Sequence, residues 1–517
     1  MLAETQDVSI KLSTLNARYI HASLGLRYLL ANMGELRQLT QLQEFIINSR
    51  PIDIVESLLA GDPDIIGLGV YIWNAGESLQ VVKLIKSISP ETIIILGGPE
   101  VTYETDQQEI TALADYVITG QGDLIFRETC ENILKGIKPL QKIIKAPPFK
   151  LSEINFPYDE YSEEDIKNRV VYIEASRGCP FKCEFCLSSL DKTVYPFDLD
   201  TFLFEMQKLY ERGVRSYKFI DRTFNLKIDS SIKIMEFFLD KMEDARQHHE
   251  KIYLHFELIP DHLPEKLKAI IERFPTDSLQ FEIGIQSLNP DIQDLISRKQ
   301  DNKKAEQNLV WIRQQTHAHI HADLIIGLPG ETVDSFAKGF NELIAMDPHE
   351  IQVGILKRLR GTPIIRHTEQ YDMRYNPEAP YDILSNNIID FNTMQQLKRF
   401  ARYWDMIANS GRFKNTKSFL LGKNPFENFL RLSNWLHAVT DQTHKIALAR
   451  LFRLLYKFMV EELQLNENKT TDLLLKDYAS SGIKGHAKFM YSQNKTSQPP
   501  KLEKRRSESR QKRHRAK

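Results

Sequence analysis

The stretch Arg177-Gly-Cys-Pro-Phe-Lys-Cys-Glu-Phe-Cys-Leu-Ser188 holds three of the four cysteines in this 517-residue chain. The three are Cys179, Cys183 and Cys186, spaced C-x3-C-x2-C. Thiolates are soft ligands that suit zinc, copper and iron–sulfur centres. A structural zinc site normally has four protein ligands, but the next histidine is His248 and the remaining cysteine is Cys130. The triad predicts an iron–sulfur cluster with one open iron; buried structural cysteines, or a zinc site completed from a distant residue, are the alternatives.

This motif, with Phe185 just before its last cysteine, resembles the signature of the radical S-adenosylmethionine (SAM) enzymes. Later motifs follow in that family's order, at residues 219–225 (FIDRTFN), 281–287 (FEIGIQS), 323–332 (DLIIGLPGET) and 356–363 (LKRLRGTP). The resemblance covers about residues 165–365. The N-terminal third resembles the cobalamin-binding domain fused to one branch of the family. The whole chain is therefore similar to cobalamin-binding-type radical SAM proteins.

The resemblance implies that the three cysteines bind a 4Fe–4S cluster, whose open iron takes SAM and whose electron cleaves it. Together with strand alternation, it predicts SAM contacts at Phe185, Asp221, Glu257, Glu282, Gln286, Ser287, Arg298 and Ile325. Asp221 would meet the methionine amine, although the family usually has Gly-Gly-Glu where this chain has Asp-Arg-Thr. Glu282 would meet the ribose and Arg298 the carboxylate, and the strand end at Ile325 would flank adenine.

Residues 8–145 alternate apolar strand-like segments with short helical ones, which predicts a parallel sheet covered on both faces. Ligands of such sheets bind outside the carboxyl ends of the strands, and small residues gather at those ends here. With the resemblance, this predicts a cobalamin site at Asn16, His21, Gly69, Tyr71, Gly97, Gly98, Gly120 and Gly122.

Two departures bear on the cobalamin prediction. The chain lacks Asp-x-His-x-x-Gly, which supplies a lower axial histidine in other cobalamin proteins, and it has Gly-Gln-Gly-Asp where Gly-Glu-Gly-Glu is commoner. We expect the cobalt to lack a histidine from this domain, because a packed or capping role suits His21 at least as well. A Rossmann-like domain that binds no cofactor is the alternative.

Residues 165–365 repeat strand and helix about six times, which suits a partial (β/α)6 barrel with its active site at the carboxyl ends of its strands. Strand alternation places Glu282, Gly284 and Gln286 on one face. His255 and Glu257 share a face of another strand. A charged residue inside a barrel needs a partner or a function, so the polar members are candidate ligand contacts if these faces point inward.

The predicted fold class is α/β, in five segments. They are a Rossmann-like cobalamin-binding-type domain (1–145), a linker (146–164), the partial barrel (165–365), a helical domain (366–490) with helix-like stretches at 381–409 and 425–465, and a disordered basic tail (491–517). Residues 501–517 carry nine Lys/Arg and two Asp/Glu, a net charge of +7. Since the whole chain has a net charge of −1, the remaining residues carry −8. The tail predicts weak contact with nucleic acid or another anionic surface, with a merely solvated tail as the alternative.

The sequence contains no apolar run long enough to cross a bilayer and no pattern of a signal peptide at residues 1–7. Its few cysteines predict a reducing, cytoplasmic setting. The resemblance implies an enzyme that cleaves SAM reductively and uses cobalamin to modify an unactivated carbon, most simply by methyl transfer. It also implies a reductant such as a flavodoxin or ferredoxin, whereas no residue indicates the substrate. The alternatives are a radical SAM enzyme without cobalamin, including a methylthiotransferase-like RNA-modifying enzyme, and a non-catalytic cluster or corrinoid sensor.

Overall fold

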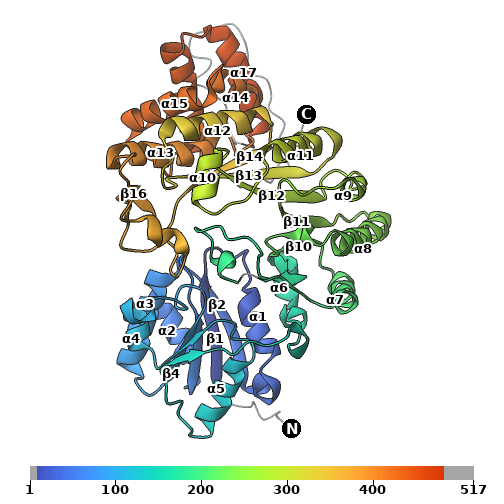
Figure 1. Cartoon of the computed structure of the whole chain (residues 1–517), viewed down its shortest axis with the longest axis vertical. Coiled ribbons are helices and arrows are strands. Elements are labelled where there is room, and N and C mark those ends of the chain that lie inside the picture. The colour runs from blue at the N-terminus through green and yellow to red at the C-terminus, as the bar shows by residue number, and fades with distance from the viewer. Residues whose placement is uncertain (1–8, 192, 483–517) are drawn as a thin grey trace. The chain divides into compact units, whose positions relative to one another are not determined.

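The structure is a computed structural model, and it describes residues 9–191 and 193–482. The chain forms two compact units (Figure 1). Unit 1 is Met1–Glu257, Lys357–Arg366 and Asn376–Asp382. Unit 2 is Leu258–Leu356, His367–Tyr375 and Ile383–Lys517. The basic tail lies outside the described residues.

The first part of unit 1 is a sheet of six parallel strands in the order β2-β1-β3-β4-β5-β6. The strands are β1 (Ile10–Asn16), β2 (Thr40–Ile46), β3 (Ile65–Gly69), β4 (Ile93–Gly97), β5 (Tyr116–Thr119) and β6 (Ile143–Lys145). In this strand order, the direction of winding reverses between β1 and β3. In open α/β sheets such a switch point is where ligands bind.

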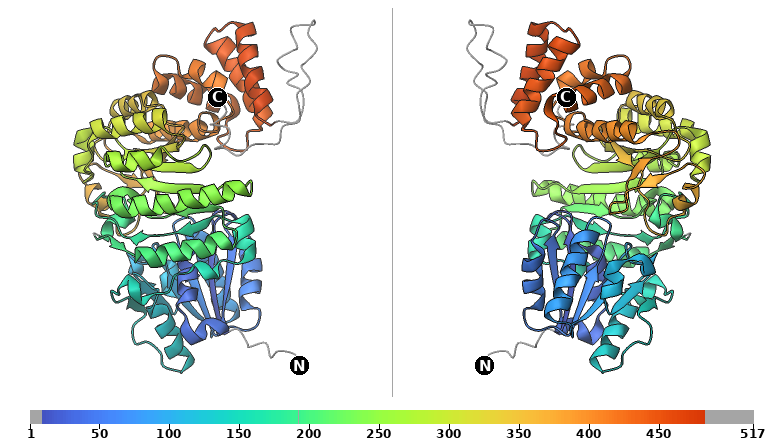
Figure 2. Two further views of the ribbon diagram at one scale, coloured as in Figure 1. Left: turned by 90° about the vertical axis from the view of Figure 1, so that its right-hand side faces the viewer. Right: turned by 90° about the vertical axis from the view of Figure 1, so that its left-hand side faces the viewer.

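Helices cover both faces of this sheet, as Figure 2 shows from two sides. They are α1 (Leu24–Ala31), α2 (Pro51–Leu59), α3 (Ala75–Ile88), α4 (Glu109–Leu113) and α5 (Ile125–Leu134). One apolar core includes side chains from α2, α3 and α4, and the other includes side chains from α1 and α5. Because both faces are buried, strands such as β3 and β4 read as continuous apolar runs. The predicted parallel sheet is confirmed.

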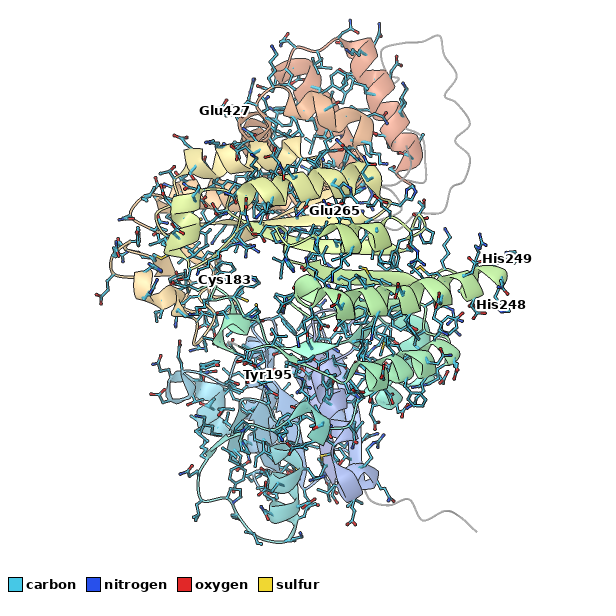
Figure 3. The ribbon with its side chains drawn as sticks, turned by 45° about the vertical axis from the view of Figure 1, so that its right-hand side comes forward. Cys183, Tyr195, His248, His249, Glu265 and Glu427 are labelled. Carbon is cyan, nitrogen blue, oxygen red and sulfur yellow. The ribbon has the colours of Figure 1, made fainter. Side chains whose placement is uncertain are left out.

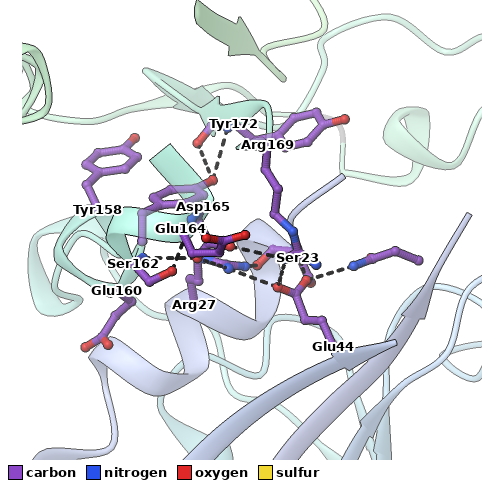
Figure 4. Close-up of polar contacts among 12 residues, drawn as sticks. Ser23, Arg27, Glu44, Tyr158, Glu160, Ser162, Glu164, Asp165, Arg169 and Tyr172 are labelled. Atoms are coloured by element: carbon purple, nitrogen blue, oxygen red, sulfur yellow. Dashed lines mark hydrogen bonds and ion pairs between the residues drawn. The ribbon is translucent and has the colours of Figure 1, made fainter. Parts of the chain in front are cut away.

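A buried ion cluster joins this sheet to the segment that follows it (Figure 4). Arg27 of α1 is 1% exposed, and its Nη2 lies 2.9 Å from Glu44 Oε2 and 2.8 Å from Asp165 Oδ2. Arg169 Nη1 reaches the same Glu44 oxygen at 2.6 Å. Asp165 belongs to α6 (Glu163–Asn168), which begins at Ser162 with a capping box. Removing one of these charges would leave a buried partner incompletely compensated, which is costly.

The second part of unit 1 holds three parallel strands, β7 (Val171–Ile173), β10 (Ser216–Phe219) and β11 (Tyr253–Leu258), with helices α7 (Leu199–Glu211) and α8 (Ile228–Gln247). In register, Lys218 pairs with Tyr172 on one side and with His255 on the other. These three side chains share one face of the ladder, because alternate residues point to opposite faces. Phe219 and Phe256 alternate with these residues, so they point to the opposite face, where both are fully buried.

Unit 2 continues the strand–helix repeat with three parallel strands, β12 (Leu279–Gln286), β13 (His319–Ile326) and β14 (Glu350–Ile355). Its helices in this part are α9 (Glu265–Ile271), α10 (Pro290–Leu295), α11 (Asn302–Gln315) and α12 (Val333–Ala345). Burial alternates along β12: Phe281, Ile283 and Ile285 are buried, whereas the residues between them are partly open. The predicted alternation of strands and helices is confirmed.

The C-terminal part of unit 2 is mostly helical: α13 (Phe391–Ile407), α14 (Lys414–Leu421), α15 (Pro425–Thr440), α16 (Leu448–Lys457), a π-helical turn (Phe458–Glu462) and α17 (Glu467–Ser480). The first of these helices, α13, packs on the barrel strand β14. Trp404 Nε1 donates to Ile351 O at 2.9 Å, and the Asn409 side chain bonds both backbone groups of Ile351. β14 is an edge strand of its sheet, and Asn409 forms hydrogen bonds with backbone groups on this strand.

The prediction of a helix-like stretch over 381–409 is wrong in its first part. Residues Ile383–Ser385 form β16, which pairs antiparallel with β15 (Arg374–Tyr375), and the helix begins only at Phe391. Asp390 caps that helix by accepting a hydrogen bond from the backbone N–H of Thr393. Among the described residues, no helix is both long and apolar enough to cross a membrane.

Candidate functional site

The three clustered cysteines lie in the loop that follows β7 in unit 1. Cys179 and Cys183 are each 8% exposed, and Cys186 is partly exposed. The loop is closed at its base by β8 (Ser176–Arg177), which pairs antiparallel with β9 (Tyr195–Pro196). Within it, Cys179 N–H donates to Asp191 O at 3.2 Å and Cys186 N–H donates to Cys183 O at 3.1 Å. Figure 3 labels Cys183 on this loop.

Only glycine fits at position 178, at the start of the loop. Gly178 has φ +90°, and a Cβ there would lie 1.9 Å from Thr193 O. Phe185, predicted to contact SAM, is partly exposed within the loop. The loop thus carries its three cysteines within eight residues, after a barrel strand and inside a segment closed by the β8–β9 pair.

The donor set fits an iron–sulfur cluster, because such clusters are held by cysteine thiolates. The pKa of the Cys179 thiol is raised to about 11, chiefly by burial; the neighbouring thiols Cys186 and Cys183 act in the same direction, and the backbone hydrogen bond from Phe181 acts against them. A bound cation would offset that penalty, since a coordinating thiol is deprotonated outright. His248, the next histidine in sequence, lies exposed at the end of α8 (Figure 3). Within the described ranges, no three His, Cys, Asp or Glu side chains are grouped to hold a metal ion.

Asp221, predicted to meet the methionine amine, lies at the base of the cysteine loop. Its Oδ1 accepts from Ser176 Oγ at 2.6 Å, and its Oδ2 accepts from Ala175 N–H at 3.0 Å. Asp221 is 4% exposed. Burial raises its pKa to about 7, while these two hydrogen bonds act in the opposite direction. In the structure this carboxyl therefore holds the segment between β7 and the loop.

Glu257 and Arg222, two further polar residues of unit 1, form an ion pair near the strand ends. Glu257, on β11, forms an ion pair with Arg222, whose Nη1 lies 2.9 Å from Glu257 Oε1. Arg222 follows Asp221 directly and is half exposed. The Glu257 side chain is partly exposed, on the strand face that it shares with His255.

Arg177, two residues before Cys179, connects the cysteine loop to the N-terminal sheet. Its Nη1 and Nη2 donate to Asp123 Oδ2 and Oδ1 at 3.1 and 2.9 Å, and its Nε donates to Glu174 Oε1 at 2.8 Å. The guanidinium also lies 4.4 Å from the ring centroid of Tyr28. Bidentate pairs of this kind fix geometry as well as adding energy. Asp123 ends the Gly120-Gln-Gly-Asp loop after β5, so the cysteine loop and this glycine loop are tied together.

The residues predicted to bind cobalamin lie at the carboxyl ends of the N-terminal strands. Asn16 ends β1, Gly69 ends β3 and Gly97 ends β4. A Cβ on Gly97 would have no atom nearer than 3.9 Å, and one on Gly120 or Gly122 none nearer than 3.5 Å. Gly97 and Gly122 thus leave the backbone open along this edge, as a large ligand requires, whereas Gly120 has φ +86°, a conformation that favours glycine whatever the space.

Gly98 has a different reason to be glycine. Its φ is +105°, and a Cβ would lie 2.4 Å from Val70 O. A backbone hydrogen bond joins the same two strand ends: Val70 N–H donates to Gly97 O at 2.8 Å. Gly98 is thus required by the close approach of the β3 and β4 ends, whatever the ligand.

His21 and Asn16 have protein partners. His21 Nδ1 lies 2.6 Å from Tyr172 OH, and its backbone forms a parallel bridge with Val170. Burial, followed by Lys218 and Arg18, lowers the pKa of His21. Asn16 Nδ2 donates to Glu44 Oε1 at 2.9 Å. The contacts of His21 are those of a packed side chain.

The sequence analysis missed Trp73. Its ring stacks on Tyr71 with centroids 4.5 Å apart and planes 8° from parallel, and the residue is 46% exposed. Trp73 Nε1 donates to Leu15 O at 3.2 Å, which places the indole at the switch point between β1 and β3. A tryptophan placed just after a predicted strand was the signal available in the sequence.

The remaining residues predicted to bind SAM belong to unit 2. Glu282 and Gln286 lie on the partly open face of β12, and Ile325 lies on the partly open face of β13. In register, Glu282 pairs with His321 and Gly284 pairs with Asp323, so this face is polar along two strands. Its polarity departs from the usual apolar filling of barrel interiors.

Ser287 and Arg298 are engaged within unit 2. Ser287 Oγ donates to Glu331 Oε1 at 2.6 Å, and burial raises the pKa of Glu331 to about 7. Arg298 Nη2 donates to Gly284 O, and to Gln300 Oε1 at 2.8 Å. Gly284 and Gln286 flank an irregularity in the β12–β13 register, and Gln286 has φ +68°. Arg298 and Ser287 therefore shape the end of β12.

Three family models match parts of the chain. The B12 binding domain matches residues 10–129, the radical SAM superfamily matches residues 173–343, and a protein family of unknown function, DUF4080, matches residues 369–516. The first two models cover the glycine-edged sheet and the cysteine loop.

Curated relatives and solved structures agree with these models. The uncharacterized methyltransferase PH0819 of Pyrococcus horikoshii is 28% identical over 60% of this chain and 70% of its own length. The cobalamin-dependent radical SAM methyltransferase TokK of Streptomyces tokunonensis is 24% identical over 62% of this chain, which spans only 51% of it. The structure of the cobalamin-dependent SAM radical enzyme OxsB with aqua-cobalamin has a TM-score of 0.61 at 15% identity, covering 91% of this chain and 80% of its own, and so shares the fold. Residues 10–129 therefore form a domain of the B12-binding kind, and residues 173–343 form a domain of the radical SAM kind that follows it in the same chain.

Proposed function

We propose that this protein is a cobalamin-dependent radical SAM methyltransferase that acts on an unactivated carbon. The observation that carries the proposal is the ion pair between Arg177 and Asp123. It ties the loop that bears the three cysteines to a loop at the open edge of the B12-type sheet. Both cofactor regions therefore belong to one compact unit.

In this proposal Cys179, Cys183 and Cys186 hold the 4Fe–4S cluster, and the glycines at the ends of β3, β4 and β5 leave room for the corrin. When bound, the cluster supplies the electron that cleaves SAM and cobalamin carries the methyl group. The chain's own residues bind, orient and shield. Asp221 holds the base of the cysteine loop through Ala175 and Ser176.

Each unit has a polar strand face that supports contact with a polar substrate or cofactor. Tyr172, Lys218 and His255 share a face in unit 1, and Glu282, His321 and Asp323 share one in unit 2. Burying polar side chains costs free energy, and hydrogen bonds to a bound ligand would offset that cost. We further propose that a low-potential one-electron donor such as a flavodoxin or ferredoxin serves as reductant.

A methylthiotransferase-like function has less support, because such enzymes hold a second cluster on three cysteines of their N-terminal domain. Here that region contains only Cys130. Cys130 is fully buried in α5, and burial raises the pKa of its thiol well above the usual range.

The proposal is tested with SAM whose methyl group is deuterated, incubated anaerobically with the cobalamin-loaded, reduced protein. Mass spectrometry of the extracted corrinoid and of the nucleosides gives the readout. We expect label on the corrinoid and release of a SAM-derived nucleoside or of S-adenosylhomocysteine. Cys186→Ala is the control and should yield no reductive cleavage. A wild-type protein with an intact cluster that leaves SAM unchanged would contradict the proposal.

A further inference from the structure

Three arginines occur in the short segment Lys357–Arg366 of unit 1, which we call the arginine segment. They are Arg358, Arg360 and Arg366. Each pairs with a glutamate that lies in one of two loops far away in sequence. One loop, residues 98–104, follows β4 at the B12-type edge, and the other is the cysteine loop.

The loop after β4 is held by two glutamates. Glu104 accepts from Arg358 Nη1 and Nη2 at 2.9 and 3.1 Å, from Arg360 Nη1 at 3.0 Å, and from Gly361 N–H at 3.3 Å. Glu100 is 4% exposed and accepts from Arg360 Nε at 2.9 Å and from Tyr381 OH at 2.6 Å. Arg360 Nη2 also donates to Tyr381 OH at 3.0 Å.

The backbone of this loop shows that the contacts determine its shape. Glu104 has φ +52°, a conformation that residues other than glycine rarely adopt and that persists only where the surroundings hold it. Gly361 has φ +77°, and a Cβ there would lie 2.3 Å from the Tyr103 ring. The loop and the arginine segment therefore fit together closely at both the charged and the apolar contacts.

The other end of the same segment holds the cysteine loop. Glu184, between Cys183 and Cys186, is 3% exposed. Its backbone O accepts from Ile364 N–H at 3.0 Å, and its carboxylate pairs with Arg366. Ile364 is fully buried. One ten-residue segment thus contacts both loops.

We propose that Arg358 and Arg360 are positioning residues, which fix the loop after β4 relative to the cysteine loop and thereby hold corrin and cluster at one separation. This inference rests on the proposed function. A merely stabilising role would require only that the ion pairs hold the fold together. The positioning role requires in addition that the distance between the two cofactors becomes variable when the pairs are lost.

The test is pulsed EPR on the loaded protein, which measures the distance between the reduced cluster and cob(II)alamin, both of which are paramagnetic. The variants are Arg358→Gln and Arg360→Gln. The matched control is Lys86→Gln, which removes a half-buried ion pair with Asp115 at the amino-terminal edge of the same sheet, where Lys86 Nζ lies 2.5 Å from Asp115 Oδ2. We expect one narrow distance in the wild type and the control, and a broadened distribution in both variants.

A catalytic readout separates positioning from stability. Misplacement by about 1 Å costs roughly 10²-fold in rate, so in the variants methyl transfer should fall steeply while SAM cleavage at the cluster continues. Arg360→Lys, which keeps the charge, should recover part of the narrow distribution. Arg366→Gln is a second variant, at the other end of the arginine segment, and it should broaden the distribution to a smaller extent, because the Arg366 side chain is 60% exposed.

Variants with both cofactors bound and an unchanged narrow distance would overturn the inference while leaving the proposed function intact. Equal broadening in Lys86→Gln would overturn it too, because the effect would then be general destabilisation. A wild-type protein that takes up the cluster but no corrinoid would overturn the proposed function and this inference together.

Discussion

Strands β4 and β12 place their functional residues in two different ways. β4 reads Ile-Ile-Ile-Leu-Gly and is apolar until its last residue, because helices cover both faces of its sheet. β12 reads Leu-Gln-Phe-Glu-Ile-Gly-Ile-Gln, and buried residues alternate with partly open ones along it. A strand of the first kind offers a ligand only its end, where glycine lets the backbone be approached. A strand of the second kind offers a whole face of side chains.

The largest expected effect is the loss of a cluster ligand from the cysteine loop, which belongs to neither kind of strand. Cys183→Ala should lose most of its iron and all reductive SAM cleavage, because three thiolates are the only soft ligands in the loop. Iron analysis after anaerobic purification gives the result. Cys130→Ala is the matched control, and its iron content should equal that of the wild type.

Exchanging side chains on the two faces of β12 should separate stability from binding. Phe281 is fully buried, so Phe281→Ala should lower the free energy of unfolding by about 3–5 kcal/mol. Glu282→Gln on the open face should change it by less than about 1 kcal/mol but should weaken SAM binding. Urea denaturation and equilibrium dialysis measure the two effects. Equal losses of stability would contradict the assignment of the faces.

At the end of β4, two neighbouring glycines should respond differently to alanine. Gly98→Ala should destabilise the protein by roughly 1–3 kcal/mol, because its φ is +105° and its Cβ would meet Val70 O. Gly97→Ala should cost no more than about 0.5 kcal/mol and should lower the affinity for hydroxocobalamin, followed by absorbance. If Gly97→Ala left that affinity unchanged, the corrin would not approach the end of β4.

The smallest effect concerns pH. Burial raises the pKa of Asp221 from its ordinary value of 3.8 to about 7. Between these values the folded protein holds a proton that the unfolded chain releases, so this group lowers stability as pH rises through that range. Asp221→Asn resembles the protonated carboxyl and should flatten the slope. Thermal unfolding at a series of pH values measures it, and an unchanged slope in the variant would contradict the assignment.

Much of the fold was predictable because hydrophobic periodicity is local. Strands such as β5, at Tyr116–Thr119, and helices such as α11, at Asn302–Gln315, follow from their own residues. Segments that depend on distant partners were not predictable. β6 has three largely exposed residues, and β16 becomes a strand only because it pairs with β15.

The candidate site divides in the same way. The cysteine motif is compact in sequence, so its chemistry could be read directly. The pair Arg177–Asp123 is 54 residues apart and the pair Arg360–Glu100 is 260 apart. No local pattern connects such residues, and only the folded chain shows that they hold the two cofactor regions together.

The central claim is that one compact unit holds a cluster and a corrinoid. Its most direct test is anaerobic purification from cobalamin-supplemented cells, with iron, sulfide, zinc and corrinoid measured on the same sample. The account predicts about four irons per chain, as a 4Fe–4S cluster requires, together with stoichiometric corrinoid. Zinc in place of iron, or iron without corrinoid, would contradict it.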